Sequence, residues 1–473
     1  MHCFNRLLLL SITVFLAACG DWVWSPLPFP TPGQHDLVVL TRAGQLSHIT
    51  DDNGNASGLE HDLTEAFAQE LGVAVKYMVV APEEMEARLA QRDYHLAAAW
   101  LSPVADTRIQ ATPPIFQTQD ILVQHDASLP LNEMAQLGGK TVHVMAGSRQ
   151  ASNLRRLSES ILDLTIIEVG QGDIIDLLES LGNRQVNYVA MDKNLEDIAN
   201  QFVPNLRSSL LLSEEQPIVW LLGTHPNSEL AARAKNFIER IQLDGTLAKL
   251  EDRYFGHVHR LNQADVVKFL GQIETMLPKL RKFFHAAETL TGIDWRLIAS
   301  VAYHESHWDA NATSPTGVRG IMMLTEETAD RLNVSNRLDP RESVVAGARY
   351  INILKEMLPS EVREPDRTWL ALAAYNIGPG HFNAARNIAK QLKADPNAWY
   401  EMKRVLPLLA KPQYYQRLKS GRARGGEAVI LVENIRSYYD ILARHEPPLQ
   451  QISARMESMI SEQGRSPGLK LKR

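Results

Sequence analysis

The sequence predicts an α/β domain followed by an all-α domain. At 473 residues the chain is too long for one ordinary hydrophobic core. Between residues 36 and 257 short apolar runs alternate with segments of helical periodicity, whereas after Leu261 the strand signals largely vanish. The hydrophobic fraction of 45% and the charged fraction of 22% are typical of globular proteins. We therefore expect at least two folded domains.

The start of the chain predicts secretion. Arg6 is followed by the apolar run LLLLSITVFLAA, residues 7–18, which is shorter than the roughly 20 residues that span a bilayer but typical of a signal peptide. The run ends in LAAC, which resembles a bacterial lipobox and implies cleavage before Cys19 and lipidation of its thiol. The alternative is an ordinary signal peptide, residues 1–18, with an incidental cysteine after it.

We expect residues 19–36 to form a lipid-anchored tether, because the four prolines from Pro26 to Pro32 favour a stiff, extended chain. In lipoproteins an Asp directly after the lipidated cysteine retains the protein at the inner membrane, and here Gly20 follows Cys19. The resemblance therefore implies anchoring at the periplasmic face of the outer membrane. Cys3 would leave with the signal peptide, so no disulfide framework is expected.

Overall charge argues against nucleic acid as a partner. The net charge is −6, which gives no basic field to attract phosphates. The chain ends in RSPGLKLKR, a short basic run within residues 451–473 that we expect to be a solvated tail.

The predicted α/β domain covers residues 37–257. The helical segments HDLTEAFAQEL and EEMEARLAQ lie between apolar runs, an alternation that favours α/β architecture. The predicted strands are residues 36–42, 73–80, 95–100, 141–147, 186–192 and 217–223.

This region resembles the family 3 periplasmic solute-binding proteins, on GLEHDL (58–63), AAAWLSPVADTR (97–108), GGKTVHVMAGS (138–148), NYVAMD (187–192) and DGTLAKLEDRYFG (244–256). The resemblance implies two lobes, joined by crossing strands near 120–126 and 217–223, that close on a ligand. It further implies that Arg108 binds a ligand carboxylate, that the helix start beside Ser148 binds the same anion, and that Asp192 meets an ammonium group. Pro103, Val104 and Ala105 replace the usual hydroxyl residues, so a surface role for Arg108 is the alternative.

The all-α domain, residues 268–450, contains an acid on an apolar helix face. In the helix that begins near the probable N-cap Asp294, the residues Ile298, Val301, Ala302 and Glu305 have the spacing of one buried face. Apolar surroundings raise the pKa of a carboxyl group, which suits a general acid at neutral pH. A solvated or paired glutamate is the alternative.

Three motifs strengthen the catalytic interpretation of Glu305. Glu305-Ser306, the run from Gly320 to Met323, and the run Ala374-Tyr375-Asn376 resemble the ES, GLMQ and AYN motifs of family 1 lytic transglycosylases, whose catalytic domain has a goose-type lysozyme-like fold. The resemblance implies cleavage between N-acetylmuramic acid and N-acetylglucosamine, with a 1,6-anhydromuramic end as product. It implies peptidoglycan as the partner and no cofactor. The residues expected to bind substrate are Ser306, Gly320, Ile321, Met322, Met323, Tyr375 and Asn376.

The single acid fits this reaction. An ordinary glycosidase uses two carboxylates, whereas here Glu305 would protonate the leaving oxygen and then remove the proton from the muramic C6 hydroxyl. The motifs offer no obvious second carboxylate, because Asp309 is expected to help end the helix. His304 and His307 lack the H-E-x-x-H order, so no metal site is expected.

Two departures leave a second interpretation open. Met323 stands where the family has Gln, and Leu431 stands where many members have Tyr, for which Tyr438 or Tyr439 is a possible substitute. The alternative is a ligand-sensing lipoprotein whose lysozyme-like domain binds glycan without cutting it. A hydrolase that uses water, and leaves a reducing end, is a further alternative. In the favoured interpretation the α/β domain binds wall-derived peptides or amino acids and modulates cleavage.

Overall fold

The computed structural model describes residues 27–50, 54–91, 93–223 and 227–450. The chain divides into two compact units, Met1–Ile49 with Glu60–Gln117 and Pro217–Ile241, and Thr50–Leu59 with Thr118–Gln216 and Gln242–Arg473. The predicted signal peptide, Cys19 and the predicted tail at 451–473 lie outside the described residues. Within the described ranges, no helix combines the length and the apolar character needed to cross a membrane.

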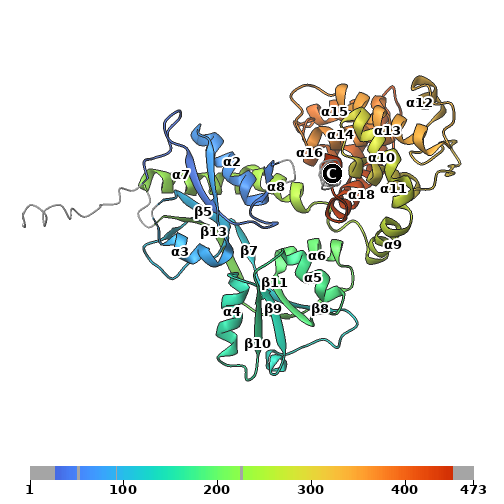
Figure 1. Cartoon of the computed structure of the whole chain (residues 1–473). Helices are drawn as coiled ribbons and strands as arrows, with labels where there is room; N and C mark the ends of the chain where they lie inside the picture. Colours follow the sequence, from blue (N-terminus) through green and yellow to red (C-terminus); the bar gives the residue numbers. More distant parts are fainter. Residues whose placement is uncertain (1–26, 51–53, 92, 224–226, 451–473) are drawn as a thin grey trace, which may run out of the picture. The chain divides into compact units, whose positions relative to one another are not determined.

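The first unit is built on a six-stranded mixed sheet (Figure 1). Strand β1 pairs in parallel with β4 and β5, and β13 runs antiparallel to β5. These inner strands read as nearly continuous apolar runs because both faces of the sheet are covered. The strands are β1 (Leu37–Thr41), β4 (Val75–Val79), β5 (Leu96–Leu101), β6 (Gln110–Ala111), β7 (Phe116–Thr118) and β13 (Gln216–Leu222). The helices that accompany them are α2 (Leu59–Leu71), α3 (Met85–Leu89) and α7 (Ser228–Asp244).

A second, five-stranded sheet lies in the other unit, in the order β10-β9-β11-β8-β12. The chain enters this unit just before β8 and leaves it at the start of β13, where the sequence predicts the crossing strands. The strands are β8 (Asp120–His125), β9 (Thr141–Met145), β10 (Thr165–Val169), β11 (Tyr188–Asp192) and β12 (Leu206–Leu211). The helices of this part are α4 (Arg149–Ser158), α5 (Ile174–Gly182) and α6 (Glu196–Phe202). A short ribbon pairs β2 (Ile49–Thr50) with β3 (Ala56–Ser57).

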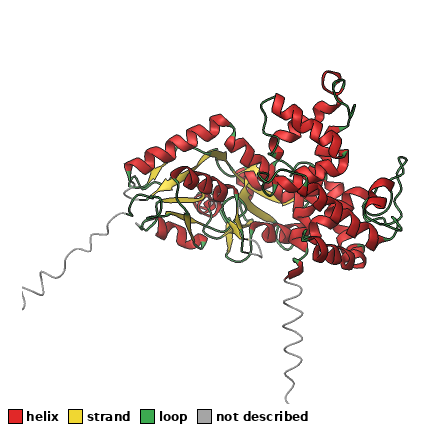
Figure 2. Cartoon of the chain, turned by 90° about the horizontal axis from the view of Figure 1, so that it is seen from above, coloured by secondary structure: helices red, strands yellow, loops and turns green. Residues whose placement is uncertain are grey.

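After β13 the described chain contains helices and no further named strand. Figure 2 colours the helices red and the strands yellow. The helices are α8 (Thr246–Phe255), α9 (Gln263–Thr275), α10 (Leu277–Thr291), α11 (Trp295–Ser306), α12 (Glu326–Arg331), α13 (Pro340–Glu356), α14 (Asp366–Ile377), α15 (Pro379–Gln391), α16 (Trp399–Val405), α17 (Pro412–Tyr415) and α18 (Gly425–His445). The predicted helical run from Ala264 to Leu290 is divided between α9 and α10, because Pro278 favours a helix start at that point. The prediction of an α/β region followed by an all-α domain is confirmed.

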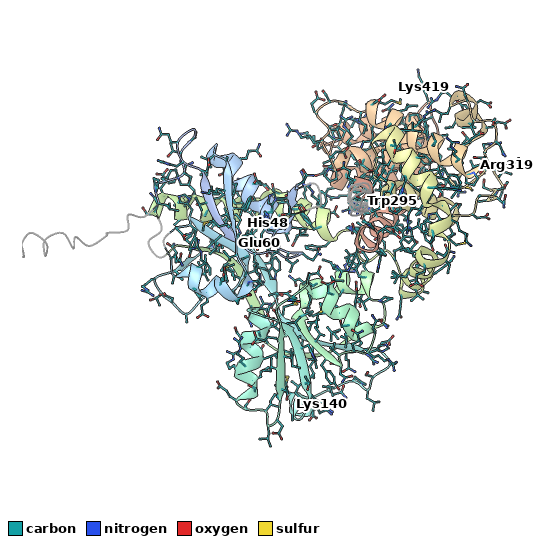
Figure 3. All side chains as sticks on the ribbon, in the orientation of Figure 1. His48, Glu60, Lys140, Trp295, Arg319 and Lys419 are labelled. Carbon is teal, nitrogen blue, oxygen red and sulfur yellow. The ribbon has the colours of Figure 1, made fainter. Side chains whose placement is uncertain are left out.

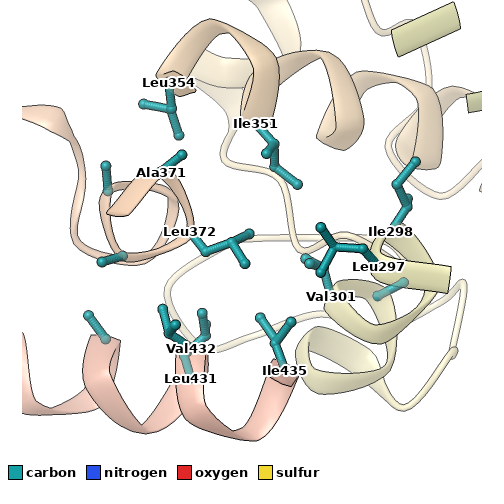
Figure 4. Close-up of a cluster of buried hydrophobic side chains, with 14 of the residues drawn as sticks. Leu297, Ile298, Val301, Ile351, Leu354, Ala371, Leu372, Leu431, Val432 and Ile435 are labelled. Carbon is teal, nitrogen blue, oxygen red and sulfur yellow. The ribbon is translucent and has the colours of Figure 1, made fainter. Parts of the chain in front are cut away.

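One hydrophobic core holds the helical domain together. It is formed largely by α11, α13, α14 and α18, whose apolar side chains face one another in Figure 4. Val301 on α11, Leu372 on α14 and Ile435 on α18 are fully buried. Full burial of such a side chain stabilises the fold by roughly 1.5–3 kcal/mol. This packing gives α11, the helix that carries Glu305, rigid neighbours on two sides.

Candidate active site

Helix α11 is fixed at both ends. At its start the carboxylate of Asp294 accepts a hydrogen bond from the backbone N–H of Arg296 at 2.8 Å, which confirms the predicted N-cap. At its end His307 adopts the left-handed conformation, with φ of 52°, so the helix cannot continue. Asp309, in the following loop, accepts from the backbone N–H of Asn311 at 2.9 Å. Glu305 therefore lies in the last turn of a well-anchored helix.

The carboxyl group of Glu305 lies in apolar surroundings. Ile298, Val301 and Ala302 on the same helix are fully buried, as the predicted stripe requires, whereas Glu305 itself is half-buried. Burial raises the pKa of Glu305 to about 7. Among the described residues no hydrogen-bond partner of its side chain is found, so both oxygens are free to meet a substrate. A pKa in this range lets the group exchange a proton near neutral pH.

Ser306 joins the 320–323 turn to α11. The Ser306 hydroxyl lies 2.9 Å from the carbonyl oxygen of Ile321 and 3.1 Å from that of Ala302, and it can donate its proton to either. The side chain is buried, and both of its partners are backbone carbonyl oxygens. Ser306 therefore fixes the position of the 320–323 turn relative to α11.

Gly320 is required by the geometry of this turn. Its φ is +80°, a conformation that side-chain-bearing residues rarely adopt. A Cβ atom there would lie 1.8 Å from the carbonyl oxygen of Arg337. The turn and the 333–339 loop thus approach each other as closely as their backbones allow.

Tyr375, at the end of α14, reaches the same turn. Its hydroxyl donates to the carbonyl oxygen of Met322 at 2.7 Å. Burial and, second, the charge of Glu305 raise the pKa of Tyr375, so the hydroxyl stays protonated. The next residue, Asn376, is exposed, and no partner of its amide is found among the described residues. The structure thus gathers Glu305, Tyr375 and the turn at one place.

The three residues after Gly320 have different environments. Ile321 and Met322 are fully buried members of the core, so their side chains shape the turn from below and offer substrate only their backbone. Met323 is half-buried and has φ of 49°. Of the three, Met323 alone has a side chain with access to solvent.

Two residues outside the motifs brace the turn. The guanidinium of Arg337 donates to the carbonyl oxygens of Gly317 at 3.0 Å and Leu324 at 3.1 Å. The hydroxyl of Ser343 accepts from the backbone N–H of Met322 at 3.3 Å. Sequence reasoning missed both residues, because neither lies in a motif and their contacts are visible only in three dimensions.

On α18 no tyrosine stands in for the Tyr that Leu431 replaces. Leu431 is buried in the core, and neither tyrosine considered as its substitute takes its place. Tyr438 packs on Tyr303, with ring centroids 4.8 Å apart, and the Tyr439 hydroxyl donates to Asp294 at the opposite end of α11. His304 instead faces α18: its Nε2 lies 3.5 Å from the Asn434 amide.

His304 is neutral in this setting. Burial, and second the nearby His307, lower its pKa to about 4. Among the described residues no group of three or more His, Cys, Asp or Glu side chains is arranged to hold a metal ion.

The residues expected to bind a ligand in the α/β region are placed as follows. Arg108 is largely exposed, at 72%, and is paired with Asp106 at 2.7 Å, an arrangement that favours the surface role weighed as the alternative. Ser148 is buried and caps α4 by accepting from the backbone N–H of Ala151 at 3.1 Å. Asp192 is buried, and its carboxylate is already engaged by the guanidinium of Arg149 at 2.7 Å.

Family models match both regions of the chain. Residues 282–397 match the transglycosylase SLT domain, and residues 37–257 match the bacterial extracellular solute-binding proteins, family 3. Among solved structures, an ancestral arginine-binding protein bound to arginine is 20% identical, with a TM-score of 0.42, over 46% of this chain and 98% of that chain.

Two curated relatives extend over nearly the whole chain. The membrane-bound lytic murein transglycosylase F of Nitrosospira multiformis is 41% identical over 438 residues, or 92% of this chain and 90% of the relative. The membrane-bound lytic murein transglycosylase F of Methylobacillus flagellatus is 40% identical over 449 residues, which cover 93% of this chain and 94% of the relative. Because the identity is high and continuous through both regions, the chain belongs to the membrane-bound lytic murein transglycosylase F family.

Proposed function

We propose that this chain cleaves the bond between N-acetylmuramic acid and N-acetylglucosamine in peptidoglycan and leaves a 1,6-anhydromuramic end. The observation that supports this most directly is the isolated carboxyl group of Glu305, whose pKa is raised by burial to about 7. Such a group donates a proton in one step and accepts one in the next at the same pH. The family and domain matches name the same class of reaction.

The reaction needs only one acid–base group. Glu305 donates its proton to the glycosidic oxygen as the bond from the muramic C1 to that oxygen breaks. The resulting carboxylate then removes the proton of the muramic C6 hydroxyl, whose oxygen forms the new bond to C1. Because attacker and target belong to one sugar, the closure gains the large effective molarity of an intramolecular step.

The surrounding residues suit a sugar substrate. The exposed amide of Asn376 is available to an N-acetyl group. Because Gly320 has no Cβ atom, a sugar ring can approach the backbone of the 320–323 turn closely. Tyr375 acts indirectly, by holding the carbonyl of Met322 in the 320–323 turn. Met323 replaces an amide with a thioether and so removes one polar contact to the substrate.

The product end tests this proposal. We expect mass spectrometry of purified peptidoglycan, digested by the chain without residues 1–19, to detect anhydromuropeptides. Reducing muramic ends would identify a hydrolase and require a second carboxylate. Binding to the wall without any product would favour the sensor instead.

We also propose that the α/β region binds wall-derived peptides or amino acids and that this binding modulates cleavage. We further propose that lipidated Cys19 anchors the chain at the outer membrane. The match of residues 37–257 to solute-binding proteins supports ligand binding. The ammonium group of a ligand would have to compete with Arg149 for the carboxylate of Asp192.

Calorimetric titration of the chain without residues 1–19 tests ligand binding. Wall peptides released by amidase are expected to give saturable heat and to change the rate of wall cleavage. Titrations of these peptides and of single amino acids that all remain without heat would contradict the proposal.

A further inference from the structure

A basic segment, residues 411–424, adjoins the end of the helix that carries Tyr375 and Asn376. Its sequence, KPQYYQRLKSGRAR, contains five cationic residues and no acidic one, in a chain whose net charge is −6. All five cations are exposed: Lys411, Arg417, Lys419, Arg422 and Arg424. Figure 3 labels Lys419 at the edge of the helical domain.

Four of these cations lack a counterion within the part of the chain that the structure describes. Arg424 pairs with Glu427 at 3.2 Å, whereas no ion pair is found for Lys411, Arg417, Lys419 or Arg422. A cluster of unpaired like charges is unfavourable for the isolated protein, because the charges repel one another. Its position therefore points to an anionic partner.

The segment is held in place by its own turns and by the core. Backbone hydrogen bonds join Arg417 to Tyr414, Leu418 to Tyr415 and Gly421 to Leu418. At its C-terminal end Gly425 packs so closely on Leu406 that a Cβ atom would lie 1.9 Å from the Leu406 carbonyl oxygen. The cations are thus presented from a fixed scaffold rather than from a loose tail.

His381 links this scaffold to the candidate active site. Its Nε2 lies 2.7 Å from the carbonyl oxygen of Ser420, to which it donates. Its Nδ1 lies 3.2 Å from the carbonyl oxygen of Ile377, the residue that directly follows Asn376. The basic segment and the proposed sugar-binding asparagine therefore share one support.

We propose that the basic segment binds the carboxylates of the peptide stems that peptidoglycan carries on muramic acid. This inference rests on the proposed function, because it places the stems of the bound glycan beside Asn376. The N-acetylated sugars are uncharged where the lactyl group is joined to a peptide, so the stem carboxylates are the anions that such a substrate offers. The segment would make the chain prefer peptide-bearing wall over bare glycan.

An anionic membrane surface fits the segment less well. Peripheral membrane binding by a basic surface commonly adds apolar side chains that enter the headgroup region. None of the exposed large apolar side chains of the described chain lies within residues 411–424.

The test compares two substrates and two charge-matched variants of the chain without residues 1–19. The substrates are intact peptidoglycan and glycan strands stripped of peptides by amidase, with the lactyl carboxylates that the amidase frees converted to methylamides. The test variant combines Lys411→Gln, Arg417→Gln, Lys419→Gln and Arg422→Gln. The control variant removes four exposed cations elsewhere, by Lys76→Gln, Lys140→Gln, Lys279→Gln and Lys390→Gln.

We expect wild type and control to have a KM for intact wall about three- to tenfold below that for stripped glycan, and the test variant to lose this preference. Salt at about 0.5 M should also remove the preference, because it screens exposed charges. Equal effects of the two variants, or an unchanged preference in the test variant, would overturn the proposal.

Two further measurements separate the remaining outcomes. Sedimentation with both substrates reports binding even without turnover, so a chain that binds peptide-bearing wall preferentially but yields no product refutes the catalytic proposal alone. Co-sedimentation with phosphatidylglycerol vesicles tests the membrane. If the test variant lost vesicle binding and kept the wild-type preference for intact wall, the segment would be a membrane surface and the proposal would be wrong.

Discussion

Glu305→Gln is expected to lower kcat for wall cleavage by about 10³–10⁴-fold. Glutamine preserves the size and shape of the side chain but neither donates a proton to the glycosidic oxygen nor accepts one from the C6 hydroxyl. Because the side chain of Glu305 has no hydrogen-bond partner within the described chain, the substitution breaks no internal hydrogen bond there. The loss would therefore report chemistry rather than damage to the fold.

The pH dependence of the wild type gives a second readout of the same residue. With the pKa of Glu305 raised to about 7, the fraction of enzyme that carries the proton declines as the pH rises through neutrality. We expect kcat/KM to fall about tenfold for each pH unit above about 7.5. A rate that stays constant from pH 6 to pH 9 would contradict the assignment of Glu305 as the general acid.

The same shift makes Glu305 costly for stability at high pH. The folded chain retains a proton that the unfolded chain releases between pH 4.5 and about 7, so the free energy of unfolding falls through this window as the pH rises. Glutamine has no such dependence. At pH 8 we expect Glu305→Gln to be more stable than wild type by up to about 3 kcal/mol. Residual solvent access to Glu305 makes the difference smaller than this bound. At pH 4 we expect the two proteins to be equally stable. Urea unfolding at the two pH values measures the difference.

The burial of the helix face that carries Glu305 was predictable because one local pattern contained it. The stripe of Ile298, Val301 and Ala302 placed Glu305 on a buried face, and the structure finds these three side chains fully buried. The bracing contacts of Arg337 and Ser343 were not predictable, since they join segments about 20 residues apart through loop conformation. Local periodicity carries no information about such contacts.

Local sequence patterns also failed to predict some of the strands. The six runs predicted from apolar composition all form strands, at β1, β4, β5, β9, β11 and β13. The strands that the prediction missed in the second sheet, β10 and β12, are its two edges. Their residues are mostly exposed or half-buried, so their sequences lack the apolar runs that mark a covered strand. Edge strands form because a neighbour offers hydrogen bonds, and a single sequence does not reveal that neighbour.

Gly320→Ala is expected to destabilise the helical domain by about 2–4 kcal/mol and to reduce kcat/KM at least about 10²-fold. The new methyl group would lie 1.8 Å from the carbonyl oxygen of Arg337, and it would force a residue with a side chain to hold φ of +80°. The backbone on one side must therefore move. Because Met322 in this turn is bonded to Tyr375, a shift there displaces the groups around Glu305.

Gly317→Ala separates the two causes. Gly317 has φ of +83°, nearly that of Gly320, yet no atom lies within 4 Å of the position of its Cβ. This control therefore carries the conformational strain without the collision and should cost only about 1 kcal/mol. Urea unfolding and initial rates on peptidoglycan measure both variants. Equal stability and activity of the two would mean that the 320–323 turn yields to the methyl group, and that its close contact with the 333–339 loop does not position the catalytic acid.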